Sequence, residues 1–282
     1  MASRKGKVGD VTNATVSHVL LIIWSAIVIV PFLWTLLSSL KDTRAILTDP
    51  FSLPDRLHWE NYANAWTGSG IGRYFLNTVI IVIAATFLVM VLGAMLAYVL
   101  ARFKFIGNKL IYNIMLLAMM FPIFLAVVPL FFLLQKMKML STMPGLIIVY
   151  VAFALPFTMF FLYSFFLQLP QEIYEAAIVD GAGEWRTFFT VMLPMAAPGL
   201  ASVAIMNFVG LWNQYLLPLV LNSKRENYVL SQAMASFASR AGYAVDFGAL
   251  FAASVITILP VFLVYVLFQR QLQGSVTQGT FR

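Results

Sequence analysis

The chain has 282 residues, of which 61% are hydrophobic and only 10% are charged, and its net charge is +7. A water-soluble domain of this length could not bury so much apolar surface, so the ordinary soluble classes are excluded and a membrane protein is the default interpretation. The basic residues stand singly between apolar stretches, which fits lipid headgroups and membrane topology better than nucleic acid. The sequence contains no cysteine, which excludes disulfides and thiolate metal sites.

Six stretches lack Asp, Glu, Lys and Arg, and each has room for one membrane-spanning helix of about 20 residues. They cover residues 11–40, 74–101, 110–135, 139–171, 187–223 and 247–269. The first follows a basic flank but is too long for a secretory signal and lacks a cleavage site, so we interpret it as a retained helix. The predicted fold is therefore all-α: one polytopic membrane domain over residues 1–282 with six transmembrane helices.

These stretches offer little chemistry of their own. No acid or base lies near the middle of a stretch, which argues against coupling to an ion gradient. The chain has no phosphate-binding loop of the G-x-x-x-x-G-K-[ST] type, and His18 and His58 stand alone. We therefore predict no catalytic residue and no metal site on this chain.

Prolines and amides are the notable features inside the stretches. The pair Pro122 and Pro129 in "MFPIFLAVVPL" is the best candidate for a bend that matters, because proline removes a backbone donor and can kink a helix. Amides buried in a membrane must find partners, and interhelical hydrogen bonds are the favoured interpretation. The alternative is a path for a polar solute, whose candidate residues are Asn207, Trp212, Asn213 and Gln214.

The segment between the fourth and fifth stretches predicts a short helix. Pro170 suits a first helical position, and Glu172 and Glu175 lie near the positive end of the helix dipole. Two alanines on one face permit close approach by another surface; that face holds Ile173, Ala176, Ala177 and Asp180.

A turn and a second helical segment follow. Gly181 and Gly183 end the first helix, and Leu193 and Pro194 mark the return to the membrane. The amphipathic turn between them holds Trp185, Phe188, Phe189 and Met192.

This segment resembles the EAA loop of ABC importer permeases. The family pattern E-A-A-x-x-x-G, nine residues, I-x-L-P is matched by Glu175, Ala176, Ala177, Gly181, Leu193 and Pro194, with Val191 in place of Ile. The resemblance implies a cytoplasmic coupling helix that docks on an ATPase, within a loop of about 168–198. It implies a contact of Glu175 with an ATPase side chain, a close fit at Ala176 and Ala177 and a turn at Gly181. The residues expected to couple to the ATPase are Glu175, Ala176, Ala177, Asp180, Gly181, Leu193 and Pro194.

The likeness extends over most of the chain from about Pro31 onward. "DPFSLPDRLHWENYANAW", "FLNTVIIV" and "LWNQYLLPLVL" resemble carbohydrate-uptake permeases, in particular the smaller permease of the maltose type. The resemblance implies a sugar importer in the cell membrane. Its expected partners are a second, different permease, two ATPase subunits that use ATP and magnesium, and an extracytoplasmic sugar-binding protein.

The charge pattern alone leaves the orientation open, because half of the 18 basic residues fall on each side. The first helix and the basic loop "ARFKFIGNK" favour a cytoplasmic N-terminus, and the cytoplasmic EAA loop that the resemblance implies agrees. We therefore expect both termini to be cytoplasmic and the loop of about 41–73 to be external.

Three alternatives remain open at this point. The solute could be different, for example an amino acid. The chain could be a membrane enzyme acting on lipid-linked sugars, although Glu172, Glu175, Asp180 and Glu184 do not share one helical face as paired acid and base groups would. A structural scaffold is a less natural fit to so many kinking prolines.

Overall fold

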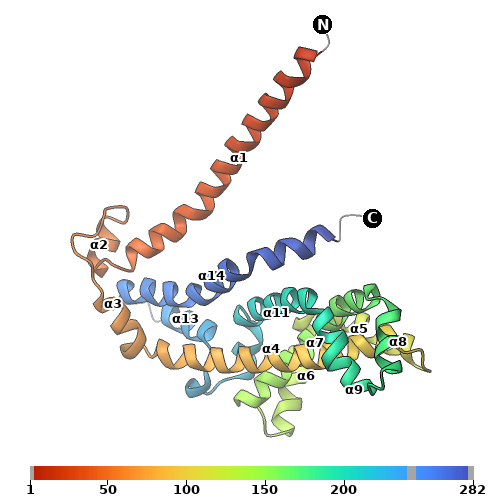
Figure 1. Ribbon diagram of the computed structural model, residues 1–282. Helices are drawn as coiled ribbons and strands as arrows, with labels where there is room; N and C mark the ends of the chain where they lie inside the picture. The colour runs from red at the N-terminus through yellow and green to blue at the C-terminus, as the bar shows by residue number, and fades with distance from the viewer. Residues whose placement is uncertain (1–2, 240–245, 279–282) are drawn as a thin grey trace. The chain divides into compact units, whose positions relative to one another are not determined.

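The computed structural model describes residues 3–239 and 246–278, and the regular elements of this part of the chain are all helices. Figure 1 shows the helices in chain order along its colour scale. The long helices are α1 Ser3–Ser38, α4 Ile71–Arg102, α7 Met143–Gln168, α11 Ala197–Trp212 and α14 Phe247–Gln278. Helices of intermediate length are α5 Asn108–Met120, α6 Ile123–Lys136, α8 Gln171–Val179 and α13 Leu230–Ser239.

Short elements connect them. They are α2 Thr43–Thr48, α3 Glu60–Ala63, the π-helix η1 Asn64–Gly68, α9 Glu184–Thr187, the π-helix η2 Phe188–Met192, α10 Leu193–Met195, α12 Leu216–Leu221 and the 3₁₀ helix η3 Arg225–Asn227.

The six predicted stretches correspond to six candidate spans within the described residues. Four are single helices: Thr15–Ser38 of α1, all of α4, all of α7, and Phe247–Gln269 of α14. Two are bent pairs, α5 with α6 at 103° and Glu184–Met195 with α11 at 78°. Counting each pair as one span gives the six helices that the charge-free stretches predict.

The third stretch is broken where the proline pair predicts a bend. Phe121 ends α5 in an extended conformation, with ψ of 123°, because the residue before a proline avoids the helical region. Pro122 is extended as well, with ψ of 122°, and α6 starts after it. Pro129, by contrast, lies inside α6, so the break belongs to Pro122.

Contacts divide the chain into two compact units, Met1–Ile71 with Ser236–Thr257 and Gly72–Ala235 with Ile258–Arg282. The single permease domain that the sequence predicts stays a prediction.

The core of the second unit joins α4, α7, η2 and α11. Small residues allow these helices to approach closely, as membrane helices commonly require. A Cβ added at Gly199, for example, would lie 2.5 Å from the ring of Phe165. The buried side chains of this core are Ala94, Ala97, Tyr98, Leu100, Met159, Leu162, Phe166, Phe188, Met192, Ala196 and Val203.

Candidate functional site: the EAA segment and an amide-lined cavity

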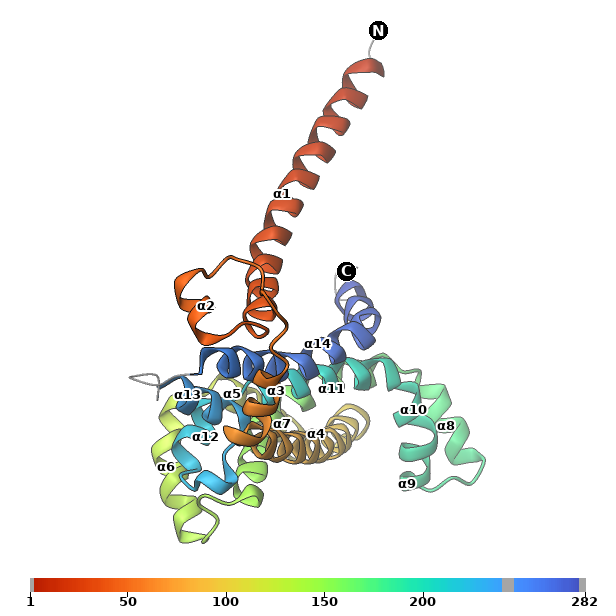
Figure 2. The ribbon, with the colours of Figure 1, turned by 90° about the vertical axis from the view of Figure 1, so that its left-hand side faces the viewer.

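The EAA segment, residues 168–198, forms a helical hairpin between α7 and α11. In Figure 2, α8, α9 and α10 lie together at one end of α11. Leu169 and Pro170 are extended, with ψ of 133° and 136°, and α8 begins at Gln171. The predicted start was wrong by one residue, because Pro170 caps the helix rather than occupying its first turn.

Gly181 ends α8 in a Schellman motif. The N–H of Ala182 donates to the carbonyl of Ala177 at 3.0 Å, and that of Gly181 donates to the carbonyl of Ile178 at 3.0 Å. Gly181 itself has a φ of +81°, a left-handed conformation that glycine adopts at low cost. The motif therefore needs glycine at this position for a backbone reason that is independent of any partner.

The residues of the EAA pattern lie mostly at the surface. Glu175, Ala176 and Asp180 are exposed, and Ala177 is half-buried. Glu175 accepts a long hydrogen bond, 3.4 Å, from the side-chain amide of Gln171 on the preceding turn. α8 and its C-cap therefore present two small residues and two carboxylates to whatever approaches, with Glu175 on a different side of the helix from Ala177.

The second half of the segment is fixed in the core of the second unit. Phe188 and Met192 are buried there, and the ring of Phe188 lies 4.9 Å from that of Tyr98. Trp185 and Phe189 face the surface instead and stack with ring centroids 6.1 Å apart. The four residues of the predicted amphipathic turn thus divide into a buried pair and an exposed pair.

Leu193 and Pro194 open α10, just before the 78° bend into α11. Leu193 is half-buried and packs against the same core, while Pro194 is exposed at the first turn of its short helix. The pair thus stands where the segment rejoins the spans.

Arg102 at the end of α4 holds the start of α8. Its guanidinium donates to the carbonyl of Leu169 at 2.6 Å and to the side-chain oxygen of Gln171 at 2.9 Å. This role of Arg102 is not among the predictions from the sequence, although a basic residue directly after an apolar stretch is a visible signal. Arg102 therefore ties a second span to the EAA segment.

A side-chain hydrogen bond joins the two halves of the hairpin. Tyr174 on α8 donates to the carboxylate of Glu184 on α9 at 2.7 Å. Burial away from water, followed by this hydrogen bond, raises the pKa of Tyr174 to about 12. The phenol is therefore a permanent donor at physiological pH.

A separate cavity of about 340 Å³ lies among α6, α7, α11 and α12. Its polar side chains are Tyr150, Asn207 and Gln214, and Phe153 and Phe157 form part of its wall. Asn207 is buried and donates to Thr158 on α7 at 2.8 Å, so it also joins two helices as the favoured interpretation predicts.

The other two predicted path residues do not line this cavity. Trp212 is buried and packs against Phe75 and Phe208, with ring centroids 5.7 and 5.6 Å away. Asn213 is exposed and donates to the carbonyl of Val209 in its own helix at 2.9 Å. The structure therefore brings Asn207 and Gln214 together and separates them from Trp212 and Asn213.

Six candidate spans, a helical hairpin anchored between two of them and a cavity with three polar side chains fit the class of a transporter membrane subunit. Residues 89–278 match the family described as the binding-protein-dependent transport system inner membrane component, and the chain belongs to that family.

Individual relatives support the same class. The chain is 62% identical over 280 residues to the diacetylchitobiose uptake system permease protein NgcG of Streptomyces coelicolor, covering 99% of this chain and 93% of that protein. It is 33% identical over 254 residues to the trehalose transport system permease protein SugB of Mycobacterium tuberculosis, covering 90% and 92%.

A solved structure shares the fold. A chain in the crystal structure of a bacterial ABC transporter involved in the import of the acidic polysaccharide alginate has a TM-score of 0.80, with 21% identity and coverage of 96% and 98%.

These findings confirm the predicted class, a permease subunit of an ABC sugar importer and hence a transport subunit rather than an enzyme. It is a multi-pass membrane protein and a component of a binding-protein-dependent transport system. Its family implies ATPase partners that use ATP and magnesium.

Proposed function

We propose that the EAA segment receives the movement of a cytoplasmic ATPase and passes it to the spans. The residues we assign to this role are Glu175, Ala176, Ala177, Asp180, Gly181, Leu193 and Pro194. The supporting observation is that α8 presents small residues and carboxylates at the surface while the other half of the hairpin is buried in the core.

The contacts of the hairpin explain how such a movement would spread. Phe188 and Met192 pack with residues of α4, α7 and α11, and Arg102 ties α4 to the start of α8. A displacement of α8 therefore moves three spans through packed side chains rather than through a flexible loop.

Paired variants test the coupling role. Glu175→Gln removes the charge from the proposed contact, whereas Glu172→Gln makes the same change at an exposed position one turn earlier and serves as the matched control. We expect Glu175→Gln to lower uptake per ATP hydrolysed several-fold and Glu172→Gln to leave it unchanged. Equal behaviour of the two variants, at equal membrane levels, would argue against a role for Glu175.

Stronger changes probe the fit at the surface of α8. Ala177→Asp and Gly181→Asp should leave the protein in the membrane yet uncouple ATP hydrolysis from uptake. Normal uptake in both variants would contradict the coupling proposal as a whole.

We further propose that the EAA segment and both termini are cytoplasmic and that residues 41–73 are external. The absence of native cysteine makes the test direct. A membrane-impermeant maleimide added to intact cells should label Asp55→Cys and should not label Lys104→Cys until the cells are opened. The opposite pattern would reverse the topology.

For the solute, we propose diacetylchitobiose or a closely related short amino sugar. The supporting observation is the 62% identity, over 99% of this chain, to a protein named for diacetylchitobiose uptake. The cavity is compatible with such a solute because amide and phenol groups can hydrogen-bond hydroxyl and acetamido groups and aromatic walls can face sugar rings. The second permease is expected to be a different chain.

Uptake of labelled diacetylchitobiose by cells that lack this chain, with and without the restored gene, tests the solute. Competition by unlabelled diacetylchitobiose but not by trehalose, maltose or amino acids is expected. If the chain supported uptake of one of those compounds instead, its assignment as an importer subunit would stand and the proposed solute would be wrong.

A matched pair tests the cavity. Gln214→Leu should reduce uptake at unchanged membrane level, because Gln214 lines the cavity. The control Asn213→Leu changes the adjacent amide, which bonds within its own helix, and should leave uptake near the wild-type level. If Asn213→Leu lost uptake and Gln214→Leu did not, the solute path would not run through this cavity.

A further inference from the structure

The loop between α1 and α3, residues 39–59, is held in place by buried polar side chains. Lys41 is only 1% exposed, and its ammonium donates to the carbonyls of Asp49 and Pro50 and to the hydroxyl of Ser52, each at 3.2 Å. These bonds draw residues 49–52 against the start of the loop. An ammonium with three oxygen acceptors is a strong local constraint.

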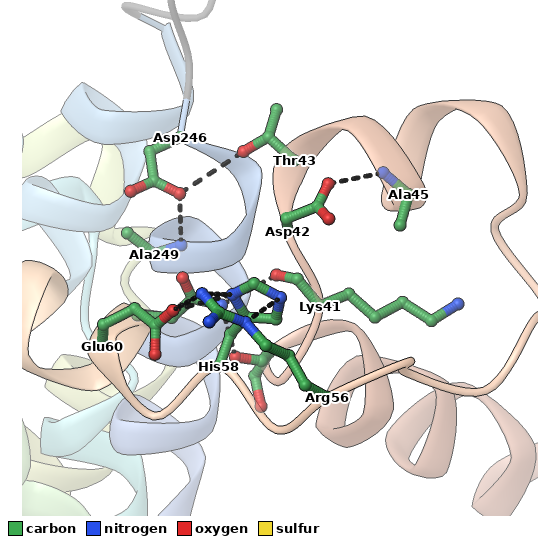
Figure 3. A network of polar contacts seen from close by, with 11 residues as sticks. Lys41, Asp42, Thr43, Ala45, Arg56, His58, Glu60, Asp246 and Ala249 are labelled. Atoms are coloured by element: carbon green, nitrogen blue, oxygen red, sulfur yellow. Dashed lines mark hydrogen bonds and ion pairs between the residues drawn. The ribbon is translucent and has the colours of Figure 1, made fainter.

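A second set of bonds fixes the base of the loop. The side-chain amide of Asn61 donates to the carbonyls of Ser39 at 2.9 Å and Lys41 at 2.8 Å. Figure 3 shows Thr43 beside Asp246, Asp42 facing the N–H of Ala45, and Arg56, His58 and Glu60 gathered in one cluster. The loop is therefore an ordered part of its unit.

The loop folds back along the last turn of α1. The indole N–H of Trp34 donates to the carbonyl of Pro50 at 2.9 Å, and its ring lies 6.5 Å from that of Phe51. Trp34 precedes Ser38, the last residue of α1, by four positions, which is about 6 Å along a helix axis. Phe51 thus lies level with the apolar part of the first span and not beyond its end.

Three large apolar side chains of this ordered loop are exposed. Phe51 is 85% exposed, Leu53 73% and Leu47 62%. The loop also exposes charged side chains: Asp42, Arg44 and Asp49 lie around Leu47 in the sequence, and Asp55, Arg56 and Glu60 follow Leu53. An ordered backbone that exposes large apolar side chains beside charged ones, with Phe51 next to the end of a membrane span, marks an amphipathic surface that a lipid interface or another molecule covers.

We propose that Leu47, Phe51 and Leu53 form a membrane foot, a surface that inserts at the boundary between lipid headgroups and acyl chains in the leaflet where α1 ends. The foot continues the exposed apolar surface of α1, whose residues from Trp24 to Phe32 lie open along the same helix. The aromatic pair Trp34 and Phe51 lies near the end of the first span, where aromatic residues concentrate in membrane proteins. The foot fixes how deeply the end of α1 sits in the bilayer.

A binding protein is another partner that could cover this surface. It would approach from the aqueous side, beyond the end of α1, whereas the contacts to Trp34 bring the foot back toward the apolar part of the helix. The position of the foot therefore favours lipid.

Single-cysteine fluorescence on the assembled importer in lipid nanodiscs tests the proposal. The sites are Leu47→Cys, Phe51→Cys and Leu53→Cys, with Asp55→Cys as a control in the same loop, and the chain has no native cysteine to interfere. Each is labelled with an environment-sensitive fluorophore and exposed either to brominated phosphatidylcholine or to aqueous iodide. Three independent foot sites keep the test decisive if one variant does not assemble.

We expect brominated lipid to quench the three foot sites at least twofold more than position 55, and iodide to quench in the reverse order. Equal iodide quenching at all four sites with no lipid quenching would overturn the proposal. If the fluorescence at the three foot sites changed only when the binding protein was added, the proposal would also be overturned, and the surface would be assigned to that protein.

Discussion

Gly248, near the start of α14, shows how one missing methyl group shapes a polar contact. A Cβ placed on it would lie 2.5 Å from the side-chain nitrogen of Asn61. That nitrogen is the donor that bonds the carbonyls of Ser39 and Lys41. Glycine is therefore needed here because the Asn61 amide occupies the space.

Replacing Gly248 by alanine should loosen the loop of residues 39–59. Overpacking costs about 1–3 kcal/mol, which outweighs the gain of about 1 kcal/mol from alanine in a helix. We expect faster hydrogen exchange across residues 39–61 in Gly248→Ala. The control Gly68→Ala lies in the same unit and has open space at its Cβ position, so its exchange should match that of the wild type.

Tyr174 makes a prediction about pH. Its pKa is raised from 10.0 to about 12, first by burial and then by its bond to Glu184, so the folded state favours the neutral phenol. This contribution to the stability of the hairpin is complete below pH 10 and is lost as the pH rises from about 10 to about 12.

The phenolate absorbance of the wild type minus that of Tyr174→Phe should show one group titrating near pH 12. In Glu184→Gln the same group should titrate closer to 10, because the carboxylate that accepts its hydrogen bond and repels the phenolate is gone. A wild-type difference curve centred near pH 10 would contradict the hydrogen bond.

At the scale of elements, the EAA segment depends on Arg102 as well as on its own sequence. Arg102→Gln should lower uptake per ATP hydrolysed, because the start of α8 loses a charge-assisted bond of 2.6 Å to the Leu169 carbonyl. Arg102→Lys should restore part of the coupling, since an ammonium can still donate to that carbonyl. The exposed neighbour Lys104→Gln is the control and should behave as the wild type.

The elements that could be read from the sequence are those with strong local signals. Charge-free length predicts the six candidate spans, Pro122 predicts the break in the third, and Gly181 predicts the end of α8. Long-range contacts carry no such signal. Nothing near Lys41 in the sequence indicates that three oxygens eight to eleven residues later will bury its ammonium.

The candidate site also has one part with a local sequence signal and one part without. The EAA pattern located the hairpin, because its fixed spacing reflects a local turn. The four predicted path residues are close together in the sequence, but in the structure Asn207 and Gln214 line one cavity and Trp212 and Asn213 do not. Which side of a broken, bent span faces a cavity depends on helix rotation, and a proline-rich stretch leaves that rotation open.

At the scale of the whole molecule, the chain is one part of a larger assembly. Affinity purification of the tagged chain from native membranes in mild detergent should recover a Walker-type ATPase and a second permease of a different sequence, together with a binding protein. Mass spectrometry identifies each. Recovery of this chain alone under every gentle condition would contradict the heteromeric importer.

The break at Phe121 and Pro122 has a mechanical consequence. A continuous helix is a stiff rod that carries an axial push through its hydrogen bonds, but two extended residues and a 103° corner interrupt that ladder. α5 packs against α7, whereas α6 packs against α12, so the two pieces of the span contact different helices. The third span therefore behaves as two jointed arms, and a strain applied at one reaches the other through α7 and α12 rather than along its own backbone.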